Sequence, residues 1–292
     1  MHLLYLIFGN NYDNYLQAHA SILSFKAHCK ELKTINIITD SPQWFSSTSG
    51  EQLHITQLSP QQLQAWKGEH NFFWRAKIKA IQQISQTYPG EPIVYLDTDT
   101  FLYTGASRIT QRLAENKALM HLEEGPIKED SSKTIKKMYR QILDLPDAPL
   151  ENLADYHMWN AGVVASPNSK DGREFALALK LCDYLCKMQV TDRLIEQFSL
   201  SVALEHCYGL EESMESIAHY WSNKKQWNAF WSQFFLSASF KNISPSEMPQ
   251  HFTQQDFAEA PAVLKISKNT KKRLISWLEK KFPDKKVVYL HP

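Results

Sequence analysis

Two carboxylates end a short apolar run in the segment Pro92-Ile-Val-Tyr-Leu-Asp-Thr-Asp-Thr-Phe101. Residues 93–96 form a continuous β-branched, aromatic and leucine run, which is typical of a strand covered on both faces. In an extended chain, residues two apart point to the same side, so Asp97 and Asp99 face one point and Thr98 faces away. Converging carboxylates are costly unless a cation neutralises them, and oxygen ligands suit Mg²⁺ or Mn²⁺. The segment therefore predicts a divalent metal site, which commonly binds a diphosphate.

The composition indicates a globular protein with a sizeable core. The chain has 292 residues, of which 43% are hydrophobic, with only 9 glycines and 13 prolines. This length fits one large domain or two small ones, and this apolar content argues against a disordered or fibrous chain.

Strand-like and helix-like segments alternate along the first hundred residues. We expect strands over residues 3–8, 35–39 and 53–58, and helices over 12–28 and 72–86. Alternation of this kind predicts an α/β fold that begins as a parallel sheet. Further expected elements are a strand over 118–121, a loop–helix insertion over 123–155, a strand over 158–166, and helices over 173–189 and 192–204.

One lysine interrupts the apolar face of the helix expected over 72–86. Lys77 lies four residues after Phe73, on the same face as Ala76, Ala80 and Ile84. A lysine at such a position either extends its ammonium to the surface or reaches into a site, and the sequence leaves both open.

The C-terminal end is strongly basic. Residues 261–292 carry nine Lys/Arg and two acidic residues, a net charge of +7, so the rest of the chain carries −6. Basic side chains here alternate with large apolar ones, namely Lys271, Lys272, Arg273, Leu274, Ile275, Trp277, Leu278, Lys280, Lys281 and Phe282. This pattern favours contact with anionic membrane lipid over nucleic acid. Packing of the same side chains on the main domain is the alternative.

The cysteines and the hydropathy pattern favour a cytoplasmic protein. Cys29, Cys182, Cys186 and Cys207 show no paired metal-site spacing, and no apolar signal segment precedes the first strand. No run approaches the roughly 18–20 apolar residues of a membrane span. We therefore expect reduced thiols and a cytoplasmic location, with peripheral contact at the inner membrane face through residues 261–292.

Three later motifs accompany the carboxylate pair. They are Asn160-Ala161-Gly162, Glu196-Gln197 and His219-Tyr-Trp-Ser-Asn-Lys-Lys225-Gln-Trp227. In this order, the motifs resemble those of GT-A-fold nucleotide-sugar glycosyltransferases. The resemblance is closest to the family-8 type, which includes bacterial lipopolysaccharide galactosyl- and glucosyltransferases and glycogenin.

The family-8 pattern is Asp-x-Asp, Asn-(Ser/Ala)-Gly, Asp-Gln and His-x-x-Gly-x-x-Lys-Pro-Trp. This chain matches it over roughly residues 1–230, with Glu196 in place of Asp. It departs from the pattern at Ser222, where the family has Gly, and at Gln226, where the family has Pro. Both departures concern the backbone path of the loop between His219 and Trp227.

Besides a helical insertion and a basic C-terminal extension, which it does not cover, the resemblance implies a Rossmann-like mixed central sheet flanked by helices. It implies a glycosyltransferase domain over 1–236, divided into a nucleotide-sugar half (1–105) and an acceptor half (106–236). The extension then covers residues 237–292.

The implied reaction transfers a sugar from a nucleotide diphosphate sugar, a UDP-sugar first, to an acceptor hydroxyl with retention. Bacterial surface polysaccharide or lipopolysaccharide synthesis would be its setting, with a glycan or lipid-linked acceptor. Asp97, Asp99 and His219 would bind the metal, and a mixed oxygen and nitrogen set favours Mn²⁺ over Mg²⁺. Gln197 would lie near the anomeric carbon and act in catalysis together with Asp99.

The resemblance also implies a set of donor-binding residues. Lys225 would neutralise the diphosphate, although the neighbouring Lys224 could take this role. Asn10 and Tyr12 follow the first strand, where open parallel sheets bind ligands and where base and ribose would sit. The remaining donor-binding candidates are Arg75, Lys77, Asp97, Asn160 and Gly162.

Three alternatives stay open. Inversion would need a carboxylate base, for which Asp155 is available. A haloacid-dehalogenase-like phosphotransferase also uses a strand followed by Asp-x-Asp with Mg²⁺, but Phe101 stands where such enzymes usually have Thr or Val. A catalytically inactive scaffold that binds a nucleotide or glycan would keep the fold without turnover.

Overall fold

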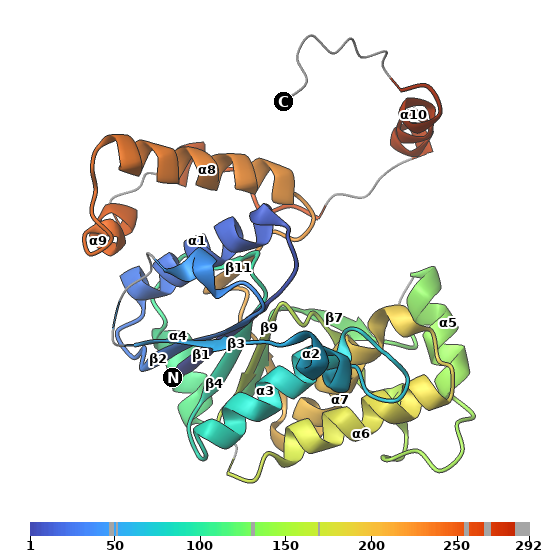
Figure 1. Ribbon diagram of the computed structural model, residues 1–292. Helices are drawn as coiled ribbons and strands as arrows, with labels where there is room; N and C mark the ends of the chain where they lie inside the picture. Colours follow the sequence, from blue (N-terminus) through green and yellow to red (C-terminus); the bar gives the residue numbers. More distant parts are fainter. Residues whose placement is uncertain are drawn as a thin grey trace.

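A seven-stranded mixed sheet forms the centre of the molecule in the computed structural model (Figure 1). The structure describes residues 1–46, 50, 52–129, 132–168, 170–253, 257–265 and 270–283. The strands of this sheet are β1 (His2–Ile7), β2 (Thr34–Thr39), β3 (Leu53–Gln57), β4 (Ile93–Leu96), β6 (Ala118–Met120), β9 (Val163–Ser166) and β10 (Leu210–Glu212). They lie in the order β10-β6-β9-β4-β1-β2-β3, and only β9 runs antiparallel to its neighbours. The predicted α/β fold with a mixed central sheet is confirmed.

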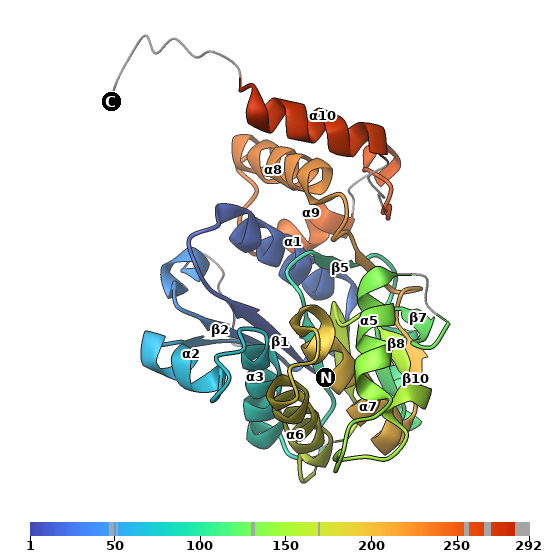
Figure 2. The same ribbon diagram turned by 90° about the vertical axis from the view of Figure 1, so that its right-hand side faces the viewer.

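Helices cover both faces of this sheet (Figures 1 and 2). One face packs on α1 (Tyr12–His28) and α4 (Ser107–Ala114), and the other on α2 (Pro60–Trp66), α3 (Arg75–Thr87), α6 (Arg173–Lys187) and α7 (Ile195–Tyr208). In β4, Val94 and Leu96 enter the core under α1, whereas Ile93 and Tyr95 enter the core under α3. Because side chains alternate along a strand, a continuous apolar run fills both cores, as the sequence predicted.

Helix α3 begins later than expected, and this changes the place of one aromatic residue. The predicted helix started at Phe72, but α3 starts at Arg75, so Phe73 precedes it. Phe73 is 41% exposed and stacks edge-on against Phe8 and Trp74. The prediction that Phe73 belongs to the buried helix face is wrong, because the helical period does not extend to it.

Two predicted elements are interrupted. The expected strand over 158–166 divides into β8 (His157–Trp159) and β9, with Asn160-Ala161-Gly162 between them. The expected helix over 192–204 begins with a 3-10 turn, η3 (Asp192–Leu194), before α7 starts at Ile195. Both interruptions lie at motifs that the sequence marked as functional.

The insertion over 123–155 contains β7 (Glu123–Pro126), α5 (Lys133–Ile142) and η2 (Leu153–Asp155), apart from residues 130–131, which lie outside the described ranges. Strand β7 pairs with β8 in a separate two-stranded sheet. Ile135, Met138 and Ile142 of α5 are buried in the same core as α6 and α7. This part of the insertion is therefore packed on the domain.

The C-terminal part contains α8 (Lys224–Phe240), α9 (Met248–Thr253), η4 (Phe257–Glu259) and α10 (Thr270–Lys281). Helices α8 and α9 pack on α1 through a third core, which includes Leu16, Leu23, Trp231 and Phe252 (Figure 2). Helix α8 runs through the predicted domain boundary between residues 236 and 237. The division into domains at that point stays a prediction.

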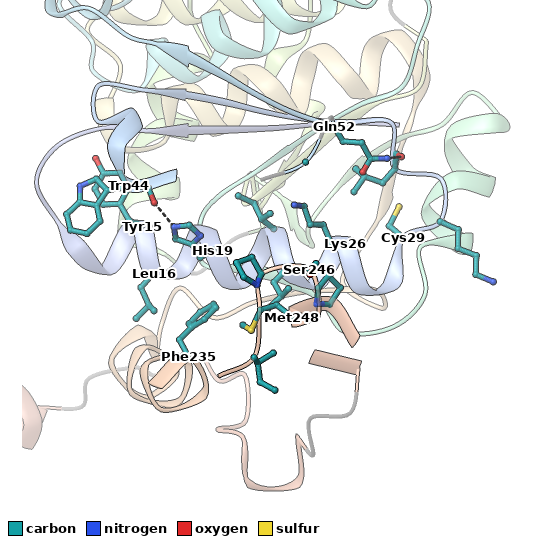
Figure 3. A pocket seen from close by; sticks show the side chains of 18 of the residues that line it. Tyr15, Leu16, His19, Lys26, Cys29, Trp44, Gln52, Phe235, Ser246 and Met248 are labelled. Carbon is teal, nitrogen blue, oxygen red and sulfur yellow. Dashed lines mark hydrogen bonds between the residues drawn. The ribbon is translucent and has the colours of Figure 1, made fainter. Parts of the chain in front are cut away.

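A cavity of about 940 Å³ lies along α1, between it and the segment that joins α8 to α9 (Figure 3). Its third side is formed by residues near η1 (Pro42–Phe45).

Within the described ranges, no helix has both the length and the apolar character that a membrane crossing requires. No disulfide joins the four cysteines, all of which lie in the described part of the chain.

Candidate metal and donor site

The two carboxylates lie in a tight turn between the central sheet and a small sheet of β5 (Thr100–Leu102) and β11 (Ile217–His219). The backbone N–H of Asp97 donates to the carbonyl of Gly162 at 2.8 Å. Its own carbonyl accepts from the N–H and the hydroxyl of Thr100, at 3.2 and 2.8 Å. The Thr98 hydroxyl donates to Gln17 of α1 at 3.1 Å. A turn, rather than a continuous strand, therefore orients the pair.

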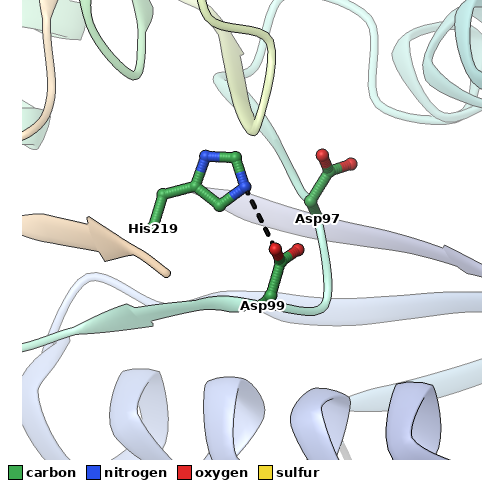
Figure 4. A group of neighbouring side chains, drawn as sticks. All are labelled: Asp97, Asp99 and His219. Atoms are coloured by element: carbon green, nitrogen blue, oxygen red, sulfur yellow. Dashed lines mark ion pairs between the residues drawn. The ribbon is translucent and has the colours of Figure 1, made fainter. Parts of the chain in front are cut away.

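His219 completes the cluster from the end of β11. It pairs in register with Thr100, the residue after Asp99. Its Nε2 lies 3.4 Å from Oδ2 of Asp99 (Figure 4). Asp97, Asp99 and His219 each offer one ligand atom, and these atoms lie within 4.8 Å of one another. The structure thus brings His219 to two carboxylates that lie far from it in the sequence.

The orientation of the imidazole is set by Asn160. The backbone N–H of Gly162 donates to Asn160 Oδ1 at 3.1 Å, which identifies this atom as the amide oxygen. The same oxygen lies 2.9 Å from His219 Nδ1, so Nδ1 carries the proton and donates. Nε2, the nitrogen left for a metal, faces the carboxylates. A ligand histidine is usually held in this way by an acceptor behind it.

Gly162 is required here for space. A Cβ at this position would lie 2.2 Å from Cε1 and Nδ1 of His219. The imidazole therefore packs directly on the backbone, and any side chain would displace it.

The three side chains fit a divalent cation. Asp99 is 3% exposed, and its Oδ2 lies 2.9 Å from Nζ of Lys224 and 3.4 Å from Nε2 of His219. Burial by itself would raise the pKa of Asp99, but His219 and Lys224 outweigh burial and hold the pKa below its ordinary value. A buried carboxylate stays charged only where cations lie beside it, and an ion held between Asp97 and Asp99 would add to the charge that Lys224 supplies. Two carboxylates with a neutral imidazole suit Mn²⁺ better than Mg²⁺.

Lys77 reaches into the site instead of extending to the surface. Its Nζ donates to the carbonyl of Ala161 at 2.6 Å and lies 3.1 Å from Glu196 and 3.4 Å from Asp97. It also lies 4.7 Å from the centre of the Tyr95 ring. Burial lowers the pKa of Lys77, but the two carboxylates outweigh it, so its pKa is raised and the ammonium stays charged. Lys77 therefore bridges Asp97, one of the three clustered side chains, to Glu196.

Arg75 makes different contacts. Its Nε and one terminal nitrogen bind both carboxylate oxygens of Asp183 on α6, at 2.6 and 3.0 Å. A further bond, of 2.9 Å, goes to the carbonyl of Trp66. These contacts join α2, α3 and α6, and donor binding by Arg75 stays a prediction.

The structure separates the two neighbouring lysines at the start of α8. Lys224 Nζ lies 2.9 Å from Oδ2 of Asp99 and lines the cavity at the carboxylates. Lys225 is exposed on the next position of the helix. Of the two candidates that the sequence left open, Lys224 is the one in contact with the cluster. The assignment of Lys225 to the diphosphate stays a prediction.

Gln197 lies in the first turn of α7, next to Glu196. Its side-chain amide donates to Glu124 of the insertion at 2.9 Å. Burial raises the pKa of Glu196, and Lys77 partly offsets that shift. Glu196 thus contacts Lys77, whereas Gln197 contacts the inserted segment.

A cavity of about 360 Å³ opens at the carboxylates, lined by Phe8, Asn14, Phe73, Trp74, Lys77 and Lys224 among others. Of the two residues predicted to hold base and ribose, Asn10 is exposed in the loop after β1. Tyr12 is exposed too, packs edge-on against Trp44, and lines the larger cavity instead. Their roles stay predictions.

Sequence reasoning missed several neighbours of the cluster. Tyr95 donates its hydroxyl to Asp97 at 2.9 Å, a contact that its position two residues earlier on the strand could have suggested. His121 lies with its ring centre 5.1 Å from that of His219. Burial and the charge of His219 lower the pKa of His121 to about 4, so it is neutral at pH 7. No motif around His121 indicated this position.

No protein-family profile and no curated protein sequence matches the chain. Among solved structures, the chain is similar to the galactosyltransferase LgtC in complex with donor and acceptor sugar analogs, with 14% identity and a TM-score of 0.45. It is also similar to the structure of an active-site mutant of LgtC, with 13% identity and a TM-score of 0.47. It is also similar to mouse xyloside xylosyltransferase 1 in its apo form, with 12% identity and a TM-score of 0.46. Each match covers 72% of this chain. It covers 72% of the LgtC complex, 71% of the LgtC mutant and 84% of the xylosyltransferase. Because these similarities are weak, we base the functional assignment on the geometry of the site.

Proposed function

We propose that this protein is a metal-dependent glycosyltransferase that moves a sugar from a nucleotide diphosphate sugar, with UDP as the nucleotide, to an acceptor hydroxyl. The observation that supports this most strongly is the convergence of Asp97, Asp99 and His219 beside a cavity flanked by two lysines. A divalent cation with nearby ammonium groups stabilises a departing diphosphate, which is the charge that develops when a sugar leaves.

Each residue of the cluster has a role in this proposal. Asp97, Asp99 and His219 would hold Mn²⁺ or Mg²⁺, which supplies electrostatic stabilisation of the diphosphate. Lys224 extends from the start of α8 to the carboxylate of Asp99. It adds a positive charge on the solvent side, where its side chain is 43% exposed. Lys77 fixes Asp97 from the buried side. Phe73 and Trp74 give the cavity aromatic surfaces on which a base can stack.

Retention of the anomeric configuration follows from the family resemblance, with Gln197 near the anomeric carbon. The contact of Gln197 with Glu124 supports a place for it at the edge of the insertion, where an acceptor would bind. Inversion would require a carboxylate base at the acceptor. Asp155, the candidate for that base, is exposed at the end of η2.

The test is a screen of UDP-sugars for metal-dependent hydrolysis, with release of UDP as the readout. We expect turnover with Mn²⁺, loss of turnover in excess chelator, and recovery when Mn²⁺ is restored. Asp99→Asn keeps the shape of the side chain but removes the charge that a cation needs, so it should abolish turnover while circular dichroism stays unchanged. Full activity in excess chelator would contradict the metal-dependent mechanism.

The inactive-scaffold alternative predicts binding without turnover. A protein that is stabilised thermally by UDP and Mn²⁺, yet releases no UDP from any donor in the screen, would favour it. The haloacid-dehalogenase alternative predicts release of inorganic phosphate from a phosphate monoester such as p-nitrophenyl phosphate, so a parallel assay with that substrate separates it from the other two.

The proposal includes contact with the cytoplasmic membrane face through α10, as the acceptor could be lipid-linked. Trp277 of α10 is 53% exposed, and Phe282, the residue after the helix, is 72% exposed; Lys280 and Lys281 lie between them in the sequence. Each lysine near an anionic surface adds about 1 kcal/mol of binding free energy. Residues 266–269 and 284–292 of the basic segment lie outside the described ranges.

Co-sedimentation with anionic vesicles tests this contact. Replacing Trp277 and Phe282 by serine in the full chain should reduce binding, because their burial in the interface is lost. Phe240→Ser is the matched control, since Phe240 is 82% exposed at the end of α8. Equal binding by the three proteins would remove the hypothesis.

A further inference from the structure

The chain after α9 comes back to the start of α8, close to the carboxylates. We call residues 257–264 the return segment; it consists of η4 and the irregular stretch that follows. Phe257 packs against the third core, and its ring stacks on that of Phe101, with ring centres 6.2 Å apart and planes at 8°. Phe101 follows Asp99 by two residues. The return segment therefore packs on β5, the strand that leaves the carboxylate turn.

One buried amide joins the return segment to the start of α8. Asn223 is 5% exposed and occupies the N-cap position of α8. Its Nδ2 donates to the carbonyl of Ala262 at 2.8 Å and to Oε1 of Gln226 at 3.0 Å. Its Oδ1 accepts from the backbone N–H of Leu264 at 3.5 Å. The side chain thus holds two backbone groups of a segment about 40 residues later in the chain.

These contacts differ from those of an ordinary N-cap residue. An asparagine at this position commonly accepts, through its side chain, from the backbone N–H groups of the first helical turn. In α8 that bond is not made, and the backbone carbonyl of Asn223 accepts from the N–H groups of Gln226 and Trp227 instead, at 3.1 and 3.4 Å. Because the side chain is directed to another segment, it fixes the place where the helix starts.

The residue that gains from a fixed helix start is Lys224. Its Nζ lies 2.9 Å from Oδ2 of Asp99, but its side chain is 43% exposed. Ion pairs of exposed lysines are weak, because the cost of ordering the long side chain offsets the Coulomb attraction. Two backbone bonds of 3.1 Å limit this cost here, one from the N–H of Tyr220 to the carbonyl of Asp99 and one from the N–H of Asn223 to the carbonyl of Tyr220. The bond from Asn223 to Ala262 holds the same backbone from the other side.

We propose that Asn223 is a positioning residue of the donor site, which keeps Lys224 beside Asp99 by attaching the start of α8 to the return segment. The inference rests on the proposed function, because it takes Lys224 as a contact of the donor diphosphate. It makes part of the C-terminal extension, which the sequence places outside the glycosyltransferase domain, a structural component of the donor site.

Calorimetric titration of the full chain with UDP, in the presence of Mn²⁺, tests the attachment. Asn223→Ser supplies a preferred N-cap residue, so α8 is kept, but the serine side chain is too short to reach Ala262. We expect Asn223→Ser and Asn223→Ala to weaken UDP binding equally, by roughly 10-fold. Wild-type affinity in Asn223→Ser with a loss only in Asn223→Ala would overturn the proposal, because capping of the helix would then be the whole role of Asn223.

The dependence on Lys224 is tested in a second background. In Lys224→Met, the change Asn223→Ser should alter UDP affinity less than about twofold, because the ammonium that it positions is absent. A full 10-fold loss in this background would show that Asn223 acts on UDP binding by another route, and the proposal would fail.

Asn36→Ala is the matched control. Asn36 is 4% exposed, its Nδ2 donates to the carbonyl of Leu3 at 3.0 Å, and its Oδ1 accepts from the hydroxyl of Tyr88 at 3.1 Å. It is therefore also a buried amide that holds a distant backbone group, but it belongs to neither cavity lining. Its loss should leave UDP affinity unchanged. An equal loss of affinity in Asn36→Ala would refute a specific role for Asn223.

Unfolding in urea without nucleotide separates this inference from the proposed function. Asn223→Ser and Lys224→Met then act on the same contact with Asp99, so the double variant should lose less stability than the sum of the two single losses. Strictly additive losses would overturn the positioning role, whether or not UDP binds. Non-additive losses in a wild type that binds no UDP would uphold the positioning of Lys224 and contradict the proposed function alone.

Discussion

The contact between Gly162 and His219 gives the sharpest test of the proposed metal site. A Cβ at residue 162 would lie 2.2 Å from two atoms of the imidazole, whereas an ordinary contact needs at least 3.4 Å. In Gly162→Ala the ring must therefore move by about 1.2 Å, or the backbone must shift by a similar amount. The backbone of residue 162 does not have a positive φ, so the alanine methyl group is the sole source of strain.

The expected cost follows from this displacement. Overpacking a tight site costs about 1–3 kcal/mol of folding free energy. Metal ligands must lie within about 0.2 Å of their ideal distances, so a shift of this size removes His219 as a ligand. Disturbing the residues that hold a ligand typically lowers metal affinity about 10- to 100-fold. We expect Mn²⁺ affinity to fall at least tenfold in a protein that is still folded.

The assay is Mn²⁺ binding by calorimetry, with the free energy of unfolding measured in parallel by urea titration. Gly105→Ala is the matched control, because a Cβ there meets nothing within 4 Å. In the His219→Ala background the Gly162→Ala change should cost almost no stability, because the ring that it strikes is absent. Unchanged Mn²⁺ affinity in folded Gly162→Ala would refute the assignment of His219 as a ligand.

Three further predictions concern other charged groups. Lys77→Met should lower the free energy of unfolding by about 3–5 kcal/mol, because it leaves the partly buried carboxylates of Asp97 and Glu196 without their cation. A loss below about 1 kcal/mol in urea titration would contradict the bridging role. Lys224→Met should weaken UDP binding roughly 10- to 100-fold, whereas Lys225→Met should change it less than about twofold; calorimetry that shows the reverse order would restore Lys225 as the diphosphate ligand. Hydrogen bonds from Lys33 and His2 lower the pKa of Glu91 to about 2, so its contribution to stability is present above about pH 4.5 and is lost as the pH falls toward 2. Because Glu91 is well exposed, Glu91→Gln should remove less than about 1 kcal/mol, and acid-unfolding curves of variant and wild type should converge near pH 2.

The architecture could be predicted because its signals are local. The apolar run at residues 93–96 is buried on both faces, and α1 covers the predicted 12–28 without an error at either end. Asn11 marks the start of α1, since its side chain accepts from the N–H of Asp13. Periodicity of side chains fixes such elements before any tertiary contact is known.

The details that the sequence does not reveal depend on contacts between distant segments. Nothing near Arg75 indicates that Asp183, on α6, will bind it. The choice between Lys224 and Lys225 depends on the rotation of α8 relative to Asp99, and neighbouring residues on a helix differ by about 100° in direction. The start of α3 is equally non-local, because Phe73 lies against Phe8 at the end of β1. Sequence patterns name the candidate residues, and the packing of the elements decides among them.

For the tripeptide Asn160-Ala161-Gly162, the role expected from the sequence differs from the contacts that the structure shows. The family resemblance assigns Asn160 and Gly162 to donor binding, and in the structure several of the tripeptide's polar contacts hold other residues of the site. The carbonyl of Gly162 accepts from Asp97, the side chain of Asn160 accepts from His219, and the carbonyl of Ala161 accepts from Lys77. Because one short connection between β8 and β9 fixes two proposed ligands and the buried lysine, changes here should act on metal affinity first. An effect on the Michaelis constant for the donor would then follow from the loss of the metal.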